Sequence, residues 1–264
     1  DNTPAAVSCL WRMIMSKLFK PVVLIPVYDH EHAIDKVVAA VLQHGVRCML
    51  VDDGSSVACA NVLDALAAAE PEKITLVRHA ENRGKGAAVL TGFARAAADG
   101  FTHVLQIDAD GQHCVADIPK FLAEAAAHPD CIVAGYPIYD DSVPAIRLYC
   151  RYLTHVWVWI NTLSLDIKDS MCGFRVYPVT PVIALIARQK IGARMNFDTD
   201  ILVRLYWDGL KVINLPTRVA YPIDGVSHFR VWLDNVLITR MHATLFFGML
   251  CRIPSLLARK WQMR

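Results

Sequence analysis

The chain has 264 residues, of which 55% are hydrophobic, and this composition excludes an intrinsically disordered protein. Its formal net charge of +2 gives no reason to expect a nucleic-acid partner. The eight cysteines form no Cys-x-x-Cys pair, which favours buried thiols in a reducing compartment over a disulfide or zinc framework. We expect a cytoplasmic protein without a spanning helix, because no uninterrupted apolar run reaches the roughly 18 residues that a span needs.

Residues 6–20 are compatible with a helix that covers the core or faces a membrane. From residue 21 onwards, short apolar runs alternate with segments of helical periodicity. The predicted strands are 21–27, 46–51, 74–77, 102–107, 131–134 and 211–215, and the predicted helices are 33–43, 57–69, 85–98 and 115–127. Strands that are apolar along nearly their whole length predict an α/β fold, with a mainly parallel central sheet flanked by helices on both faces.

Polar residues gather where the predicted strands end. The first strand is followed by Tyr28, Asp29 and His30, the second by residues 52–56, and the third by residues 80–86. In a parallel sheet, ligands bind beyond the carboxyl ends of the strands, so these segments are expected to meet at one edge. Taken singly, each segment is also typical of an ordinary turn, and the third lacks the spacing of a P-loop.

The predicted strand 102–107 leads into Asp108 and Asp110, with the amide Gln112 and the imidazole His113 just beyond them. Carboxylates at positions i and i+2 of an extended segment project from the same side. Two neighbouring anions are unfavourable unless a cation lies between them. Hard oxygen ligands that are few in number suit Mg²⁺ or Mn²⁺, which keeps waters and also takes up substrate phosphates. A polar turn is the alternative, but the clusters at the other strand ends favour the metal site.

Four motifs at these strand ends together resemble the family 2 glycosyltransferases of GT-A fold. They are Ile25-Pro26-Val27-Tyr28, Val51-Asp52-Asp53-Gly54-Ser55, Asn82-Arg83-Gly84-Lys85-Gly86 and Asp108-Ala109-Asp110-Gly111-Gln112-His113. The branch that the sequence resembles contains the dolichol-phosphate mannose synthases and the polyprenyl-phosphate hexosyltransferases. The resemblance covers residues 21–137 strongly and residues 169–230 more loosely, and it implies a sugar-nucleotide donor without specifying the sugar.

The resemblance assigns donor and metal roles to particular residues. Donor binding is implied for Pro26, Tyr28, Asp29, Asp53, Arg83, Gly84, Lys85 and Asp108, and metal binding for Asp108, Asp110 and Gln112. Pro26 and Tyr28 would line the nucleobase pocket, and Asp53 would accept a hydrogen bond from the base. Lys85 and the main chain of Gly84 and Gly86 would border the nucleoside and diphosphate. Asp110 would also be catalytic through the Mg²⁺ or Mn²⁺ that it holds. The family usually has Asn and Glu after the tyrosine, whereas Asp29 and His30 follow it here.

The second half of the chain supplies the acceptor-side candidates. A helix is predicted over residues 143–165, and residues 169–175 resemble the family's acceptor-side motif ending in Gly-Phe-Arg; a helix-to-strand turn hinged at Gly173 is the alternative. Acceptor binding is implied for Asp169, Arg175, Ser227, His228 and Arg230. His228 stands where the polyprenyl-phosphate branch has a lysine. Arg230 offers a bidentate grip on phosphate that a lysine lacks.

Another helix is predicted to begin within residues 196–200, and it carries Asp198 and Asp200 in its first turn. In the family, an acidic residue at this place often serves as the catalytic base, and Asp198 is the preferred candidate over Asp200. Either carboxylate is alternatively an N-terminal capping charge. A base is required only for a hydroxyl acceptor, because a phosphate monoester is already nucleophilic.

Residues 231–264 are apolar with interspersed basic residues, and they predict C-terminal amphipathic helices. Such helices suit the cytoplasmic face of a membrane with anionic lipids, as in a peripheral protein. A dimer-forming helix or one that covers the core is the alternative. We therefore divide the chain into a GT-A domain, 1–230, with a donor-binding half, 21–137, and an acceptor-side half, 138–230, followed by the helices of 231–264.

These observations predict an inverting, metal-dependent glycosyltransferase that moves a hexosyl unit from a UDP- or GDP-linked sugar to a lipid-linked acceptor. Polyprenyl phosphate is the leading acceptor, and a lipid or glycan hydroxyl is the alternative. A nucleotidyltransferase also uses such a sheet, but the first strand is not followed by the basic glycine-rich signature expected there. A non-catalytic sugar-nucleotide sensor is a third hypothesis, which the intact pair of carboxylates disfavours.

Overall fold

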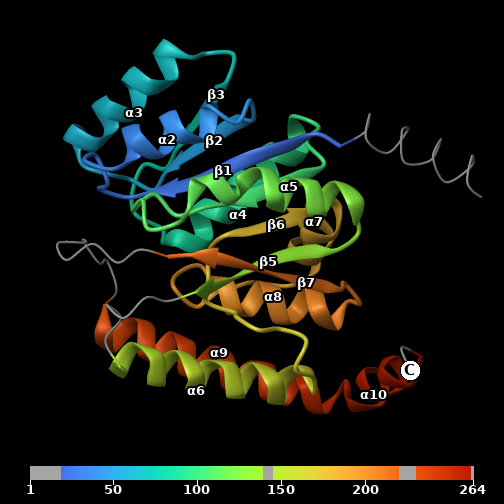
Figure 1. Cartoon of the computed structure of the whole chain (residues 1–264). Coiled ribbons are helices and arrows are strands. Elements are labelled where there is room, and N and C mark those ends of the chain that lie inside the picture. The colour runs from blue at the N-terminus through green and yellow to red at the C-terminus, as the bar shows by residue number, and fades with distance from the viewer. Residues whose placement is uncertain (1–18, 139–144, 220–229, 263–264) are drawn as a thin grey trace, which may run out of the picture.

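The computed structural model describes residues 19–138, 145–219 and 230–262 (Figure 1). The strands are β1 (Pro21–Val27), β2 (Arg47–Asp52), β3 (Ile74–Arg78), β4 (His103–Gln106), β5 (Ile132–Ile138), β6 (Arg175–Pro178) and β7 (Val212–Arg218). The helices are α2 (Ile34–Leu42), α3 (Val57–Ala69), α4 (Lys85–Ala98), η1 (Val115–Asp117), α5 (Ile118–Ala127), α6 (Ala145–Thr162), α7 (Val179–Arg188), α8 (Phe197–Trp207), α9 (Val231–Leu250) and α10 (Ile253–Gln262). The predicted helix at residues 6–20 lies almost entirely outside the described residues.

The strands form one seven-stranded sheet in the order β3-β2-β1-β4-β6-β5-β7. Strands β1 to β4 pair in parallel, as do β5 and β7, whereas β6 runs antiparallel to both β4 and β5. The sheet is therefore mainly parallel, as predicted. Because β6 lies between β4 and β5, the segment that follows α6 returns to the middle of the sheet.

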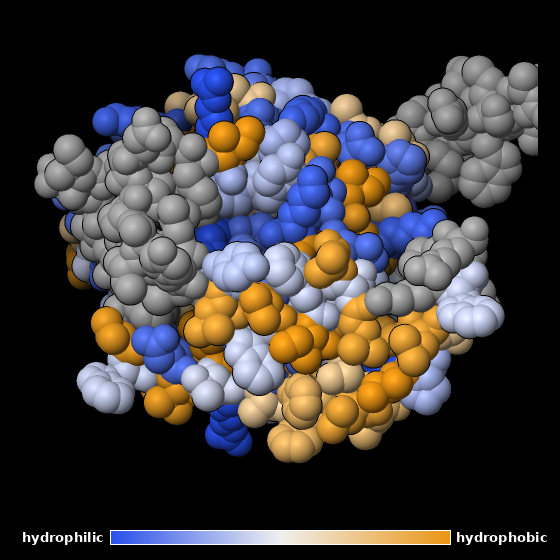
Figure 2. Space-filling view, turned by 60° about the horizontal axis from the view of Figure 1, so that its bottom comes forward, coloured by the Kyte–Doolittle hydropathy of each residue, from blue (hydrophilic) through white to orange (hydrophobic). Residues whose placement is uncertain are grey.

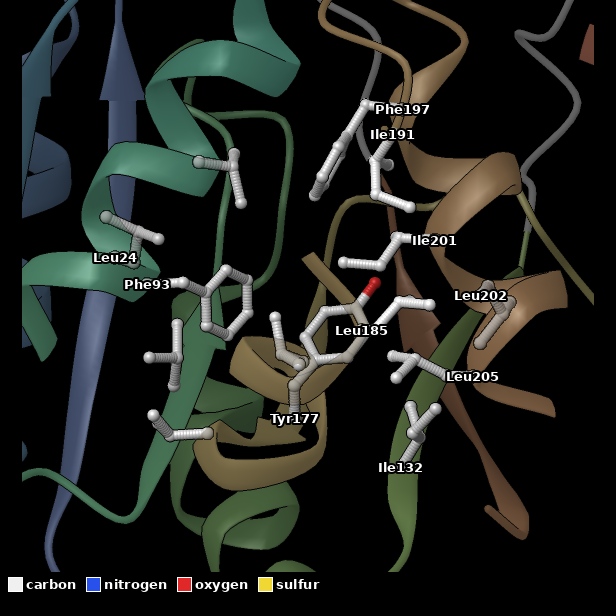
Figure 3. Close-up of a cluster of buried hydrophobic side chains, with 14 of the residues drawn as sticks. Leu24, Phe93, Ile132, Tyr177, Leu185, Ile191, Phe197, Ile201, Leu202 and Leu205 are labelled. Carbon is white, nitrogen blue, oxygen red and sulfur yellow. The ribbon is translucent and has the colours of Figure 1, made fainter. Parts of the chain in front are cut away.

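Both faces of the central strands β1, β2 and β4 are buried, which explains why most residues of these strands are apolar. Successive residues of a strand point to opposite faces, so Val22 and Leu24 pack under α4, α7 and α8, whereas Val23 and Ile25 pack under α2, α3 and α5. Figure 3 shows the first of these cores, where the Phe93 ring of α4 meets the Tyr177 ring of β6 edge to face at 5.6 Å.

Most predicted elements agree with the structure to within a few residues, but two were missed and two strands are longer. β6 and α7 had not been predicted, because four residues of β6 carry too little periodicity to signal a strand. The predicted strand 131–134 continues to Ile138. The strand predicted to end before Pro216 continues to Arg218, and since β7 is the outermost strand of the described sheet, beside β5, the ring of Pro216 is tolerated there.

Helices α6 and α9 lie side by side below the sheet, with α8 between them and the strands (Figure 1). On α9, Met241, Leu245 and Met249 are buried against the protein. Two cation–π contacts hold the C-terminal segment against α8. The guanidinium of Arg252, in the turn between α9 and α10, lies 4.7 Å from the ring centroid of Trp207, and that of Arg259, in α10, lies 4.4 Å from the ring centroid of Tyr206. The C-terminal helices therefore pack on the rest of the protein with one face.

The opposite face of α9 is also apolar, and it is exposed. Val236 and Phe247 are 59% and 66% exposed, and they lie on the same side of the helix because eleven residues make about three turns. Figure 2 shows apolar residues gathered across this side of the molecule. Within the described residues, no single helix is long and apolar enough to cross a membrane, whereas α9 and the segment Ile253–Arg259, which meet at 74°, pass that test of length and composition together.

Candidate functional site

Asp108 lies just beyond β4 and makes two charged contacts. Its Oδ1 is 2.7 Å from Nζ of Lys85, and its Oδ2 is 3.3 Å from Nε2 of His113. Burial alone would raise the pKa of Asp108, but the ammonium of Lys85 and then the His113 ring hold that pKa below its ordinary value. Asp108 is therefore an anion in a largely enclosed setting.

Asp110 differs from Asp108 in its surroundings. Burial, followed by the negative charge of Asp108, raises the pKa of Asp110 above its ordinary value. Its Oδ1 accepts a hydrogen bond of 3.0 Å from the main-chain N–H of Gln112, across a turn in which Gly111 has a φ of 72°. A bound cation would offset both the burial of this carboxylate and its repulsion by Asp108.

The donor set fits a divalent cation that has few protein ligands. Asp108 and Asp110 supply hard oxygens at one point of the sheet edge. Among the residues that the structure describes, no group of three or more His, Cys, Asp and Glu side chains could hold a metal ion. The protein alone would therefore leave several coordination positions for water and phosphate oxygens, which is how Mg²⁺ is commonly bound and suits Mn²⁺ as well.

Gly173 gives Asp108 the space that it occupies. A Cβ atom at this position would lie 2.6 Å from Oδ2 of Asp108, which is closer than Cβ atoms approach non-bonded heavy atoms in proteins. The residue predicted as a turn hinge is thus required for the close approach of the acceptor-side motif to the metal candidate. This contact joins the loop before β6 to the loop after β4.

Lys85 connects the donor half to the acceptor half. It begins α4, and its Nζ lies 2.9 Å from Oδ2 of Asp198 in addition to the contact with Asp108. Burial alone would lower the pKa of Lys85, but Asp108 and Asp198 together raise it above its ordinary value, so the side chain is cationic. The buried Gln106 donates from Nε2 to the second oxygen of Asp198 at 2.8 Å.

Asp200, the other base candidate, points elsewhere. Its Oδ1 accepts a 2.6 Å hydrogen bond from Nε of Arg204, and its Oδ2 accepts one of 2.9 Å from the main-chain N–H of Gly192. It therefore anchors the loop before α8, while Asp198 faces Lys85. The structure separates two carboxylates that the sequence left nearly equivalent.

The acceptor-motif residues Asp169 and Arg175 are both buried. Asp169 accepts two hydrogen bonds from Arg151 of α6, at 2.6 and 2.8 Å, and others from the main-chain N–H groups of Met171 and Cys172. Burial would raise the pKa of Asp169, but His155 and Arg151 hold it well below its ordinary value. Asp169 thus ties the motif to α6.

The guanidinium of Arg175, expected to bind the acceptor, is fully buried. Its Nη1 donates to the main-chain oxygen of Asp198 at 2.6 Å and to the Tyr177 hydroxyl at 3.0 Å. Of the remaining acceptor candidates, Ser227 and His228 lie outside the described residues. Arg230 is exposed at the start of α9, and its main-chain N–H donates to Asp234 at 2.7 Å.

Asp53 holds the loop that precedes α4. Its carboxylate accepts hydrogen bonds from the main-chain N–H groups of Arg83 and Gly84, at 2.9 and 2.7 Å, and contacts the His79 ring at 2.7 Å. His79 in turn contacts the Thr91 hydroxyl at 2.9 Å. Asp53, which is predicted to contact the nucleobase, therefore also orders this loop, residues 79–84, which we call the donor loop.

The glycines around Lys85 have a packing role that the sequence did not reveal. A Cβ at Gly84 or Gly86 would lie 2.5 Å from the main-chain oxygen of Ala193 or Gly192, respectively. They allow the donor loop to contact the loop before α8, where the Ala87 N–H donates to the Ala193 oxygen at 2.9 Å. This contact is what places Lys85 beside Asp198.

The nucleobase candidates lie at the end of β1. Pro26 is buried in the strand, whereas Tyr28 and Asp29 are half-buried just beyond it. Asp29 has a φ of 51°, and its Oδ1 accepts a 2.7 Å hydrogen bond from the main-chain N–H of Ser56. The ends of β1 and β2 are thereby joined, as their polar clusters predicted.

Sequence reasoning assigned no role in the site to His79, Gln106 or Arg151. A signal existed for Gln106, because it interrupts an otherwise apolar run between Leu105 and Ile107 in a central strand. No local pattern marked His79 or Arg151, whose partners lie 26 and 18 residues away.

The sheet order and the placement of the carboxylates beyond β4 define the GT-A glycosyltransferase fold. The chain belongs to glycosyl transferase family 2, whose model matches residues 22–191, and it is a glycosyltransferase. A polyprenol monophosphomannose synthase of Mycolicibacterium smegmatis is 27% identical over 224 residues, which cover 79% of this chain and 80% of the relative. An undecaprenyl-phosphate 4-deoxy-4-formamido-L-arabinose transferase of Pseudomonas fluorescens is 30% identical over 62% of this chain and 49% of its own length.

Solved structures agree on the fold. Glucosyl-3-phosphoglycerate synthase from Mycobacterium tuberculosis, solved with Mn²⁺ and UDP-glucose, matches with a TM-score of 0.62 at 15% identity, covering 90% of this chain and 82% of that one. The same enzyme with phosphoglyceric acid gives a TM-score of 0.63 at 14% identity, with the same coverage. At these identities the match establishes the fold alone.

Proposed function

We propose that this glycosyltransferase transfers a hexosyl unit from a nucleotide-diphosphate sugar to polyprenyl phosphate, with inversion, and that it requires Mg²⁺ or Mn²⁺. The observation that carries the proposal is the pair Asp108 and Asp110 beyond β4, with the ammonium of Lys85 at 2.7 Å from Asp108. The names of the relatives, which specify polyprenol and undecaprenyl-phosphate chemistry, support the choice of acceptor.

The protein's own groups suit the departure of a nucleotide diphosphate. When a glycosyl–phosphate bond breaks, negative charge grows on the leaving diphosphate, and fixed positive charge stabilises it. Lys85 presents such a charge from the first residue of α4, held in place by Asp108 and Asp198. A divalent cation held by Asp108 and Asp110 would supply further neutralisation of that charge.

The hydrogen bonding of the two base candidates favours a phosphate acceptor over a hydroxyl. Both oxygens of Asp198 are engaged, by Lys85 and Gln106, and both oxygens of Asp200 are engaged, by Arg204 and Gly192. A hydroxyl acceptor needs a carboxylate that is free to take its proton. A phosphate monoester needs only to be held in line on the face of the sugar opposite the leaving group.

The face formed by α6 and α9 supports a position at the membrane surface. Tyr152 and Leu153 of α6 are 59% and 61% exposed, and they add to the exposed apolar stripe of α9. Arg151, one residue before them, binds Asp169 of the acceptor-side motif, so α6 links this face to the site. We propose a peripheral attachment to the cytoplasmic leaflet that brings the site to the lipid acceptor.

The test is a transfer assay with a panel of UDP- and GDP-sugars, Mn²⁺, and either polyprenyl phosphate or the matching polyprenol. We expect product from the phosphate only, and a loss of about 100-fold or more in Asp110→Asn. Asp99→Asn, at the far end of α4, is the matched control and should keep full activity. Equal transfer to the polyprenol would refute the preference for a phosphate acceptor. Absence of turnover with every donor would refute the proposed function.

A further inference from the structure

Gln106 is a buried, uncharged polar side chain that interrupts an apolar stretch of a central strand. It lies on β4, between β1 and β6, and is fully buried, as are its neighbours Leu105 and Ile107. A buried amide is costly unless it is hydrogen bonded. Within the described residues its Oε1 has no hydrogen-bond partner, and its Nε2 donates to Oδ1 of Asp198 at 2.8 Å. The residue's buried hydrogen bond is thus directed at Asp198.

Arg175 reaches the same residue from the neighbouring strand. Gln106 and Arg175 are direct partners in the antiparallel register of β4 and β6. Arg175 is also fully buried, and its Nη1 donates to the main-chain oxygen of Asp198 at 2.6 Å. The first turn of α8 is therefore held by one hydrogen bond to the side chain of Asp198 and another to its main chain.

The contacts continue from Asp198 into the site. The oxygen of Asp198 that does not bind Gln106 lies 2.9 Å from Nζ of Lys85, and the same ammonium lies 2.7 Å from Oδ1 of Asp108. A glutamine suits this position because it donates a hydrogen bond to the carboxylate without adding charge. A glutamate would repel Asp198, and an apolar residue would leave a buried anionic oxygen without its partner.

We propose that Gln106 is a positioning residue, which orients Asp198 so that Lys85 stays fixed beside Asp108 and the donor's leaving diphosphate. This inference rests on the proposed function and adds a determinant of Lys85 placement to it. Arg175 assists by holding the main chain of Asp198. Neither side chain needs to touch substrate for this role.

The test compares Gln106→Met with wild type and with Thr217→Val. The control removes a partly buried side-chain hydrogen bond of 2.8 Å, from the Thr217 hydroxyl to Asp117, at another strand of the same sheet. Lysine reactivity toward reductive methylation, followed by mass spectrometry on the intact fold, reports the restraint of Lys85 without requiring turnover. We expect methylation of Lys85 to be at least about threefold faster in Gln106→Met and unchanged in Thr217→Val, because the bond to the carboxylate is lost.

In the transfer assay, we expect kcat to fall about tenfold in Gln106→Met while KM for the donor changes little. A tenfold loss corresponds to the free energy contributed by one hydrogen bond to a charged group. In an Asp198→Asn background, the further change Gln106→Met should alter neither kcat nor Lys85 reactivity, since it acts through Asp198. Wild-type reactivity of Lys85 in a folded Gln106→Met variant, or additive effects in the double variant, would overturn the inference. Absence of turnover in the wild type would overturn only the proposed function, because the reactivity measurement stands alone.

Discussion

Lys85 and Asp198 lie 113 residues apart in the chain, and their side chains meet at 2.9 Å. The contact joins the first residue of α4 to the first turn of α8. The glycines on either side of Lys85 make it possible, because they let the two loops touch. The charge that faces the donor site is therefore set by parts of the chain from both halves.

Replacing Lys85 with methionine should impair both catalysis and stability. Loss of the ammonium leaves Asp108 and Asp198 without their shared partner, so we expect the free energy of unfolding to fall by roughly 3 kcal/mol. We also expect turnover to fall about 100-fold, because the leaving diphosphate loses a fixed positive charge. Chemical denaturation and initial rates measure the two effects. Lys120→Met, on the exposed side of α5, is the control, and near-normal turnover in Lys85→Met would contradict the role of its charge.

Chelation should abolish activity reversibly. We expect EDTA to stop transfer and Mn²⁺ or Mg²⁺ to restore it. In calorimetric titrations in the presence of UDP or GDP, Asp108→Asn and Asp110→Asn should weaken Mn²⁺ binding by at least about tenfold, because each removes a charged ligand. His113→Gln should have a smaller effect, since His113 contacts Asp108 and is not a proposed ligand. Unaltered Mn²⁺ affinity in both Asp variants would refute the metal assignment.

A single methyl group at Gly173 should disable the site. In Gly173→Ala the added Cβ would lie 2.6 Å from Asp108 Oδ2, so the carboxylate must move. We expect Mn²⁺ affinity to fall about tenfold, as for loss of a ligand. Gly100→Ala is the control, because its Cβ meets nothing within 4 Å and adds only the strain of a φ of 71°, about 1 kcal/mol. Equal Mn²⁺ affinity in both variants would show that Gly173 does not protect the position of Asp108.

Membrane binding is tested better by substitution than by deletion of residues 231–264, because Met241, Leu245 and Met249 of α9 belong to the buried surface. Phe247 is 66% exposed, and Phe247→Asp should reduce sedimentation with phosphatidylglycerol vesicles while the fold is kept. Asn235→Asp adds the same charge to the exposed surface of α9 and should bind vesicles nearly as well as wild type. Equal binding by both variants would exclude this apolar stripe from the membrane contact.

His242 gives the fold a specific sensitivity to acid. It is buried on α9, and desolvation lowers its pKa to about 4, whereas in the unfolded chain the pKa is about 6.5. Between these values only the unfolded chain binds the proton, so stability falls as the pH falls from about 6.5 to about 4, by at most about 1.4 kcal/mol per unit. Denaturation at several pH values should show this slope reduced in His242→Gln. An unchanged slope would show that other groups account for the acid sensitivity.

The sequence predicted most helices and strands and the edge of the sheet that carries the site, but not the contacts between residues that are distant in the chain. Strand and helix periods in residues 21–127 were strong enough to place the elements, and the order of strands placed the polar clusters at one edge. The different positions of Asp198 and Asp200 in the site depend on their contacts with Lys85 and Arg204, which form only on folding. Gly84 and Gly86 looked like phosphate-binding glycines, yet the space that they leave is filled by another loop.

The insertion of β6 has a consequence for synthesis. β4 is hydrogen bonded to β1 and β6, and β5 to β6 and β7, so β4 has one open edge and β5 has two until residues 175–218 have been made. A nascent chain that stops near residue 137 would expose bare strand edges, which promote aggregation. The sheet is therefore completed late in synthesis, and we expect a ribosome-bound intermediate of this protein to bind chaperones. The donor half is not expected to be obtainable as an independent fragment.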